Sequence, residues 1–240
     1  MYRINSSKDL AKVIEYTNLS NIATEEEIIE FLEKAKKCNF HSVVISPCYV
    51  PLAKNYLKDT NIRIGTVISF PLGFETTESK LAQTAIALTN GADEIDMVVN
   101  LSLVKSKKYK EIEDEVRKVK NLVGDKVLKV IIETKALEDD EKAKVSIAIE
   151  RAGADFIKTA TGFVTPNNIY ENVNDINIIQ KYAPKTKIKV SGGINNYKIA
   201  NQLITAGADK IGTSVGYEII EDFKDLKENA KITPKPIQFD

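Results

Sequence analysis

Two hydrophobic periodicities alternate along this chain. Short apolar runs with the two-residue period of a β-strand are each followed by a longer segment whose apolar residues recur at helical spacing. The expected strands are residues 13–18, 42–46, 63–69, 95–99, 127–132, 155–159, 187–191 and 209–212. The expected helices are residues 25–38, 50–57, 75–90, 108–122, 139–152, 169–182, 197–206 and 217–229. This alternation is typical of an α/β fold with a parallel sheet.

The junctions between these elements favour a closed barrel. Three copies of Gly-Ala-Asp begin at Gly91, Gly153 and Gly207, each after a helical pattern and just before a strand. Such a glycine suits the left-handed position that ends a helix. Eight strand–helix units in 240 residues predict a single (β/α)8 TIM barrel over residues 1–240, with an irregular tail at about 230–240. A doubly wound open sheet is the alternative, disfavoured because no Gly-x-Gly-x-x-Gly follows the first strand.

Composition narrows the class of protein. The 34 basic and 34 acidic residues are interspersed, so nothing indicates a nucleic-acid or membrane partner. The apolar runs are strand-sized and the N-terminus lacks the apolar region of a secretory signal, which predicts a cytoplasmic location. Two cysteines, Cys38 and Cys48, and one histidine, His41, are too few for a disulfide framework or a zinc site, so no metal or cofactor is expected. Self-association into a homo-oligomer is compatible with this composition.

Several predicted strands carry charged residues on the face that should point into the barrel. The strand period of two places Asp96, Lys158 and Lys189 opposite the apolar faces that pack on helices, so we expect them to converge near the upper end of the barrel. The alternative, a buried structural ion network, is disfavoured because buried ion pairs rarely stabilise better than apolar packing. Lys129 would join them, either in a direct role or paired with Asp96 or Glu133.

The two lysines of this set indicate nucleophilic chemistry. An ammonium is costly to bury, and the ordinary pKa of lysine is about 10.4. Two ammoniums ~4 Å apart at an effective dielectric of ~20 repel by about 4 kcal/mol, or roughly three pKa units. Repulsion by Lys189 would therefore suffice to make Lys158 a neutral nucleophile, with desolvation acting in the same direction.

Small residues follow the last two predicted strands. They are Gly192 and Gly193 after the seventh strand, and Gly212, Thr213 and Ser214 at the eighth. In (β/α)8 barrels these two loops often bind a phosphate through backbone amides and helix N-termini. A Gly-Gly pair alone is more often a simple turn, but the paired loops predict a phosphate site, with Thr161 and Gly162 closing its third side.

Motifs spread in order over most of the chain resemble those of the deoxyribose-phosphate aldolase family. They are Phe156-Ile157-Lys158-Thr159-Ala160-Thr161-Gly162-Phe163 and residues 47–51, 66–73, 94–100, 128–134, 189–194 and 211–214. The resemblance implies a metal-free Schiff-base aldolase that interconverts 2-deoxy-D-ribose 5-phosphate with D-glyceraldehyde 3-phosphate and acetaldehyde. It also implies that Lys158 is the Schiff-base lysine, Lys189 its charged neighbour and Asp96 the proton-transfer carboxylate.

The chain departs from the family pattern at several positions. The family's Asp-His-Thr near the first strand is here Glu15-Tyr16-Thr17, which keeps a carboxylate on a longer side chain. A cysteine common on the second strand is Val44, an arginine usual after Gly-Gly-Ile is Asn195, and the Gly-rich loop after the sixth strand is residues 164–168. These changes bear on turnover rate and phosphate affinity more than on reaction type.

Two other functions remain open from the sequence. Another imine-forming aldolase or a transaldolase would use the same paired lysines, whereas a non-catalytic sugar-phosphate-binding barrel would gain by losing two charges that repel each other. Two further residues have simple interpretations: His41 is expected in a loop or at the surface, and Cys48 near the barrel mouth is either a reactive thiol or an ordinary side chain.

Overall fold

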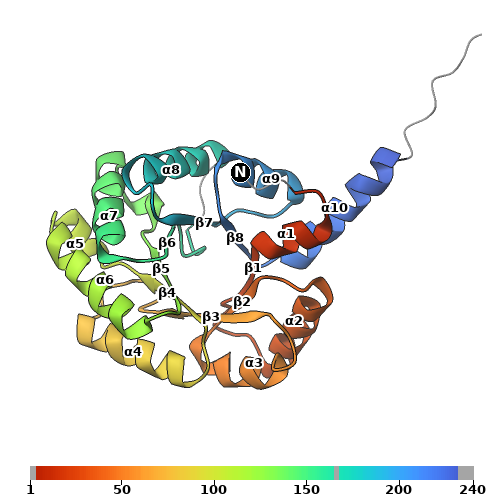
Figure 1. Cartoon of the computed structure of the whole chain (residues 1–240), viewed down its shortest axis with the longest axis horizontal. Helices are drawn as coiled ribbons and strands as arrows, with labels where there is room; N and C mark the ends of the chain where they lie inside the picture. Colours follow the sequence, from red (N-terminus) through yellow and green to blue (C-terminus); the bar gives the residue numbers. More distant parts are fainter. Residues whose placement is uncertain (1–3, 165–167, 232–240) are drawn as a thin grey trace, which may run out of the picture.

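The strands form a closed parallel barrel surrounded by helices (Figure 1). The computed structural model of the chain describes residues 4–164 and 168–231. Within them, the strands pair in sequence order from β1 to β8, and β8 pairs with β1 to close the sheet. The predicted (β/α)8 barrel is therefore confirmed and the open sheet is excluded. The predicted tail falls largely on residues 232–240, which lie outside the described residues.

The elements follow the predicted order. The strands are Ile14–Asn18 (β1), Ser42–Ile45 (β2), Arg63–Ile68 (β3), Glu94–Val98 (β4), Val127–Ile131 (β5), Phe156–Lys158 (β6), Lys187–Ser191 (β7) and Lys210–Thr213 (β8). The helices are Ser7–Val13 (α1), Glu25–Cys38 (α2), Val50–Tyr56 (α3), Thr77–Thr89 (α4), Leu101–Lys105 (α5), Tyr109–Val123 (α6), Asp139–Ala152 (α7), Ile169–Tyr182 (α8), Tyr197–Ala206 (α9) and Gly216–Lys231 (α10). Two 3₁₀ turns, Pro47–Tyr49 (η1) and Thr134–Ala136 (η2), follow β2 and β5.

Two short helices were not predicted. Helix α1 carries a capping box, because the Ser6 side chain accepts from the Asp9 N–H and the Asp9 side chain accepts from the Ser6 N–H. Helix α5 begins after Asn100, whose side chain accepts from the N–H groups of Ser102 and Leu103. Both helices have fewer than two full turns, which is too short to show a helical repeat of apolar residues. Only their cap residues could have indicated them in the sequence.

The repeated Gly-Ala-Asp triplets form equivalent junctions. Gly91, Gly153 and Gly207 all have positive φ, at 105°, 85° and 120°, as the sequence predicted. The aspartate side chain of each triplet accepts a hydrogen bond from a backbone N–H near the start of the preceding strand. Asp93 accepts from Ile64 at 3.0 Å, Asp155 from Leu128 at 2.8 Å and Asp209 from Ile188 at 2.8 Å. The triplet thus ends a helix and fixes the start of the next strand against its neighbour.

The two faces of the strands have opposite character. Ile95, Met97, Ile157 and Val190 belong to the hydrophobic core between the strands and the helices. The alternate positions of the same strands face the barrel interior and include charged residues that are at most 2% exposed, namely Glu15, Glu94, Asp96, Lys129, Lys158 and Lys189. The apolar core therefore surrounds a charged interior.

Candidate active site

The side chains of Asp96, Lys158 and Lys189 meet inside the barrel. Lys158 and Lys189 are paired residues of adjacent strands β6 and β7. Both ammonium groups contact the same carboxylate oxygen, with Lys158 Nζ 3.0 Å and Lys189 Nζ 2.8 Å from Asp96 Oδ2. The prediction from the two-residue strand period, that these three side chains point into the barrel and converge, is therefore confirmed.

Lys129 joins this group through Asp96 and brings two further carboxylates, Glu15 and Glu94, into contact with it. Lys129 Nζ lies 2.5 Å from Glu94 Oε2, 3.1 Å from Asp96 Oδ1 and 3.3 Å from Glu15 Oε2. The Glu15 carboxylate also accepts a hydrogen bond from Lys189. Lys129 is thus a paired charge, and Asp96 is one of its partners. The other partner considered from the sequence, Glu133, instead contacts Thr161.

Burial and neighbouring charges shift the pKa values of this cluster. Burial lowers the pKa of Lys158 to about 8, repulsion from Lys189 adds to this, and attraction to Asp96 opposes it. The sequence-based expectation that repulsion alone suffices is therefore corrected, since desolvation is the larger cause. Burial favours the neutral form of Asp96, but the ammoniums of Lys129, Lys189 and Lys158 outweigh it and hold the pKa of that carboxyl well below its usual range.

The predicted phosphate-binding residues line one cavity together with Lys158. This cavity of about 480 Å³ lies at the carboxyl ends of β1, β6, β7 and β8. Its lining includes Thr17, Thr161, Gly162, Gly192, Gly193, Asn195, Gly212, Thr213 and Ser214. Lys158 is therefore the residue through which the charged cluster reaches the cavity.

The cavity also has lining residues that the sequence reading missed. They are Asn18, Leu19, Ser20, Phe163, Ser191, Ile194 and Val215. Ser191 could have been found, because it shares the inward face of β7 with Lys189. The loop residues Asn18, Ser20 and Phe163 carry no periodic signal that would assign them to the site.

The glycines of the site serve different purposes. Gly192 and Gly193 have φ of 93° and 72°, a backbone conformation that favours glycine. A Cβ on Gly212 would come within 2.9 Å of Lys189 Cε, so this glycine makes room for the lysine side chain. Packing of Lys189 is thus a reason for Gly212 that does not involve a ligand.

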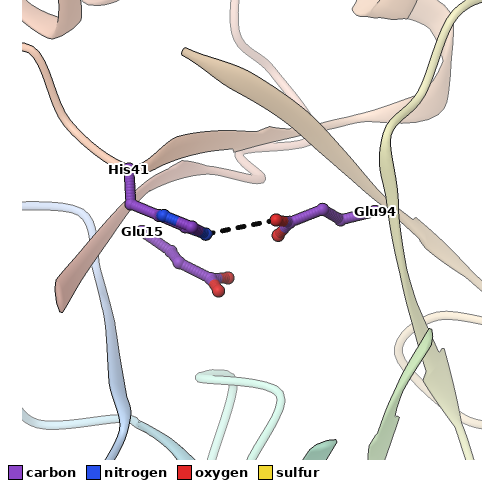
Figure 2. A group of neighbouring side chains, drawn as sticks. All are labelled: Glu15, His41 and Glu94. Atoms are coloured by element: carbon purple, nitrogen blue, oxygen red, sulfur yellow. Dashed lines mark hydrogen bonds and ion pairs between the residues drawn. The ribbon is translucent and has the colours of Figure 1, made fainter. Parts of the chain in front are cut away.

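Three side chains in and beside this group of charges have the composition of a metal site. One ligand atom from each of Glu15, His41 and Glu94 lies within 4.8 Å of the others, and the three side chains approach one another in the interior (Figure 2). However, the Lys129 ammonium contacts both carboxylates, and Arg63 Nη1 lies 3.4 Å from Glu94 Oε1. Because these cations already balance the carboxylates, the arrangement fits an ion network better than a divalent metal.

His41 departs from its sequence-based interpretation. It directly precedes β2, but its side chain is 24% exposed and its Nε2 lies 3.3 Å from Glu94 Oε1. The expected loop position of His41 is confirmed, but its ring is not free in solvent, because it turns toward the buried carboxylate of Glu94.

Three other positions named from the sequence lie in different surroundings. Val44 is fully buried and faces inward on β2, since its neighbours Val43 and Ile45 belong to the outer core. Cys48 is an exposed free cysteine in η1. Of the loop at 164–168, residues 165–167 lie outside the described part of the chain. No helix among the described residues has the length and apolar character needed to cross a membrane.

Comparison with known proteins gives a consistent set of matches. Residues 11–222 match the family model described as DeoC/LacD family aldolase. The deoxyribose-phosphate aldolase of Caldanaerobacter subterraneus subsp. tengcongensis is 43% identical over 223 residues, which are 91% of this chain and 95% of that protein. The one from Lactococcus lactis subsp. lactis is 42% identical over 211 residues, 88% of this chain and 94% of that protein.

Solved structures agree with these matches. The deoxyribose-phosphate aldolase of Aeropyrum pernix, described as having a unique tetrameric structure, superposes with a TM-score of 0.83 at 32% identity. The match covers 93% of this chain and 94% of that one. The similarity therefore extends over the whole barrel and is not confined to a single motif.

Proposed function

Because this chain belongs to the DeoC/LacD family of aldolases, we propose that it cleaves 2-deoxy-D-ribose 5-phosphate reversibly to D-glyceraldehyde 3-phosphate and acetaldehyde through a Schiff base. The observation that carries the proposal is the amine of Lys158. It lies in a sugar-sized cavity, its pKa is lowered to about 8, and it contacts a buried carboxylate. Lowering the pKa increases the neutral fraction of this amine near neutral pH, and the neutral amine is the form that attacks an aldehyde.

In the proposed reaction, Lys158 Nζ attacks the C1 aldehyde of the open-chain sugar, and loss of water gives a protonated imine. The C2–C3 bond then breaks and its electron pair moves to the imine nitrogen. At the same time the C3 hydroxyl loses its proton and becomes the aldehyde of glyceraldehyde 3-phosphate. The remaining enamine takes a proton at C2, and hydrolysis releases acetaldehyde and the free lysine.

Asp96 is assigned the proton transfers, directly or through water, with Lys189 as a relay. In the resting site, three ammonium groups hold the pKa of Asp96 low, which makes it a weak base. As electrons reach the imine nitrogen, the positive charge at Lys158 is neutralised and one of these cations is lost. Asp96 therefore becomes more basic in the step in which the C3 proton must leave.

The phosphate is assigned to the loops after β7 and β8. Within the described residues, the cavity lining includes one cationic side chain, Lys158, so backbone amides and hydroxyls must meet most of the phosphate charge. Helix α10 begins at Gly216, directly after this loop, and a helix N-terminus favours an anion. The Thr213 hydroxyl already donates to Ile194 O at 2.7 Å, which leaves Ser214 as the better side-chain donor.

The proposal includes self-association, which is supported by the tetramer described for the Aeropyrum pernix relative. A cytoplasmic location stays a prediction.

A borohydride trapping experiment tests the Schiff base. With deoxyribose 5-phosphate or acetaldehyde, reduction should attach the substrate carbon skeleton to Lys158, as read by peptide mass spectrometry. Lys158→Ala should abolish both labelling and the release of glyceraldehyde 3-phosphate in a coupled assay. Lys187→Ala, an exposed lysine on the strand of Lys189, is the control and should retain both. Activity in Lys158→Ala, or labelling at another lysine, would contradict the proposal.

A further inference from the structure

Glu133 lies at the carboxyl end of β5 and contacts the loop that follows the Schiff-base strand. Its side chain is buried, with 7% of the residue exposed. Its Oε2 accepts two hydrogen bonds from Thr161, one from the backbone N–H at 3.2 Å and one from the hydroxyl at 2.5 Å. The next residue, Thr134, donates its N–H to Thr159 O at 2.8 Å, so the two loops are joined at two points.

These contacts commit both donors of Thr161. A threonine hydroxyl has one proton, and here Glu133 accepts it. The Thr161 oxygen in turn accepts from the N–H of Phe163 at 3.1 Å. Thr161 therefore has no donor left for a phosphate, although it lines the cavity with Gly162 and Phe163. Thr161 can therefore close this side of the cavity as a wall residue, and its two donors link the wall to Glu133.

The side chain of Glu133 acts through Thr161 alone in the part of the chain that the structure describes. Its second oxygen, Oε1, is buried and has no hydrogen-bond partner there. Glu133 is also absent from the residues that line the cavity. Its backbone has φ 48°, ψ 66°, a left-handed conformation that costs a non-glycine residue of order 1 kcal/mol and persists where surrounding contacts hold it.

We infer that Glu133 is a positioning residue for the aldol reaction: by holding both donors of Thr161 it fixes residues 161–163, which form one wall of the cavity that Lys158 also lines. The inference rests on the proposed function, because it assigns this wall to the sugar-phosphate end of the substrate. Loss of the Glu133 side chain should therefore weaken binding of deoxyribose 5-phosphate and leave imine formation at Lys158 intact.

Two substrates separate these effects. In Glu133→Ala, KM for deoxyribose 5-phosphate should rise about tenfold, because two hydrogen bonds that order the wall are lost. Acetaldehyde lacks the sugar-phosphate end that is assigned to this wall. Its rate of borohydride trapping should therefore stay within about twofold of wild type. Glu133→Gln keeps an acceptor oxygen for the Thr161 hydroxyl and should fall between wild type and Glu133→Ala, which a loss of packing volume would not produce.

A double-mutant cycle tests the route through Thr161. Thr161→Val removes the hydroxyl together with its contact to the Phe163 N–H. The double variant Glu133→Ala/Thr161→Val should raise KM by less than the two single changes combined, because both remove the same contact between Glu133 and the hydroxyl. Additive increases in KM would overturn the inference. If Glu133→Ala fails to fold, the Glu133→Gln and Thr161→Val variants carry the same cycle.

Glu150 provides a matched control. Its Oε2 also accepts from a backbone N–H and a threonine hydroxyl, those of Lys185 and Thr186, at 2.6 and 3.4 Å. These residues precede β7, at the amino end of the barrel and away from the cavity. Glu150→Ala should lower Tm without changing KM. An unchanged KM in Glu133→Ala, or an equal loss of acetaldehyde trapping, would overturn the positioning role. Absence of trapping in the wild-type protein would instead contradict the proposed function.

Discussion

At the scale of single residues, the proposed chemistry depends on the amine of Lys158, whose pKa shift differs from that of Lys129. Lys129 and Lys158 are both buried lysines that contact Asp96, yet their pKa values shift in opposite directions. Burial lowers both, but three carboxylates surround Lys129 and hold its pKa above the usual range. Lys158 has fewer anionic contacts and a cationic neighbour, so burial prevails. Position within the charge network therefore gives Lys158, and not Lys129, the lowered pKa that the proposed nucleophile requires.

The pH dependence of imine formation follows from this difference. The neutral fraction of Lys158 increases as pH rises through about 8, so the rate of acetaldehyde trapping should rise over the same range and level off above it. Lys189→Met removes a like charge and frees two carboxylates, and both changes favour the protonated form of Lys158. The rising limb should therefore move to higher pH by about one unit or more.

Trapping rates measured from pH 6 to 10 check this prediction. Lys187→Met, on the same strand but exposed, is the control and should leave the limb in place. If the pH range over which the trapping rate rises is unchanged or lower in Lys189→Met, Lys189 does not lower the pKa of Lys158.

At the scale of elements, the strands supply the buried charged groups and the loops at their carboxyl ends supply much of the cavity lining. β4, β5, β6 and β7 each place a charged side chain in the interior, where the sheet holds it rigidly. The loops after β6, β7 and β8 contribute glycines and hydroxyl residues at the carboxyl ends of the same strands. Reaction and substrate binding are therefore separable by mutation.

Substitutions in the β7 and β8 loops test the phosphate assignment. Gly193→Glu and Ser214→Asp each place a negative charge beside the proposed phosphate, and should raise KM for deoxyribose 5-phosphate by roughly tenfold or more. Acetaldehyde trapping at Lys158 should change far less. Gly124→Glu, which introduces the same charge at another glycine with positive φ and open surroundings, should leave KM unaltered. Unchanged KM in both loop variants would remove the phosphate from this position.

At the scale of the whole molecule, the barrel interior is an electrically balanced core. Glu15, Glu94 and Asp96 face Lys129, Lys158 and Lys189, and all six are buried. The structural ion network weighed as an alternative from the sequence is therefore present, and it includes the residues to which the proposed chemistry is assigned. Its members contact one another across five strands, so removing one charge leaves others without compensation.

Lys129 is the member whose loss should matter most for stability. Lys129→Met should lower the free energy of unfolding by about 3 kcal/mol, because Glu94, Asp96 and Glu15 all lose a cationic partner in a buried site. Adding Glu94→Gln should recover part of this loss by removing one of the uncompensated carboxylates. Urea denaturation of the single and double variants measures both effects.

An exposed lysine provides the comparison for this cycle. Lys110 pairs with Glu113 and Asp114 but is 72% exposed, so Lys110→Met should leave the free energy of unfolding nearly unchanged. A loss in Lys129→Met no larger than this would show that the interior tolerates an unbalanced charge.

The sequence by itself determined the barrel, the junctions at Gly91, Gly153 and Gly207, and the inward direction of Asp96, Lys158 and Lys189. These features follow from local rules, since helix periodicity, the left-handed glycine and the two-residue strand period need no knowledge of distant residues. The tertiary structure alone decided the partners. The contacting residues are far apart in the sequence: Lys189 and Glu15 are separated by 174 positions, Lys129 and Glu94 by 35, and Glu133 and Thr161 by 28. Which charges compensate one another, and hence which buried lysine has its pKa lowered, depends on strand register and side-chain reach around a closed barrel, and no local pattern contains that information.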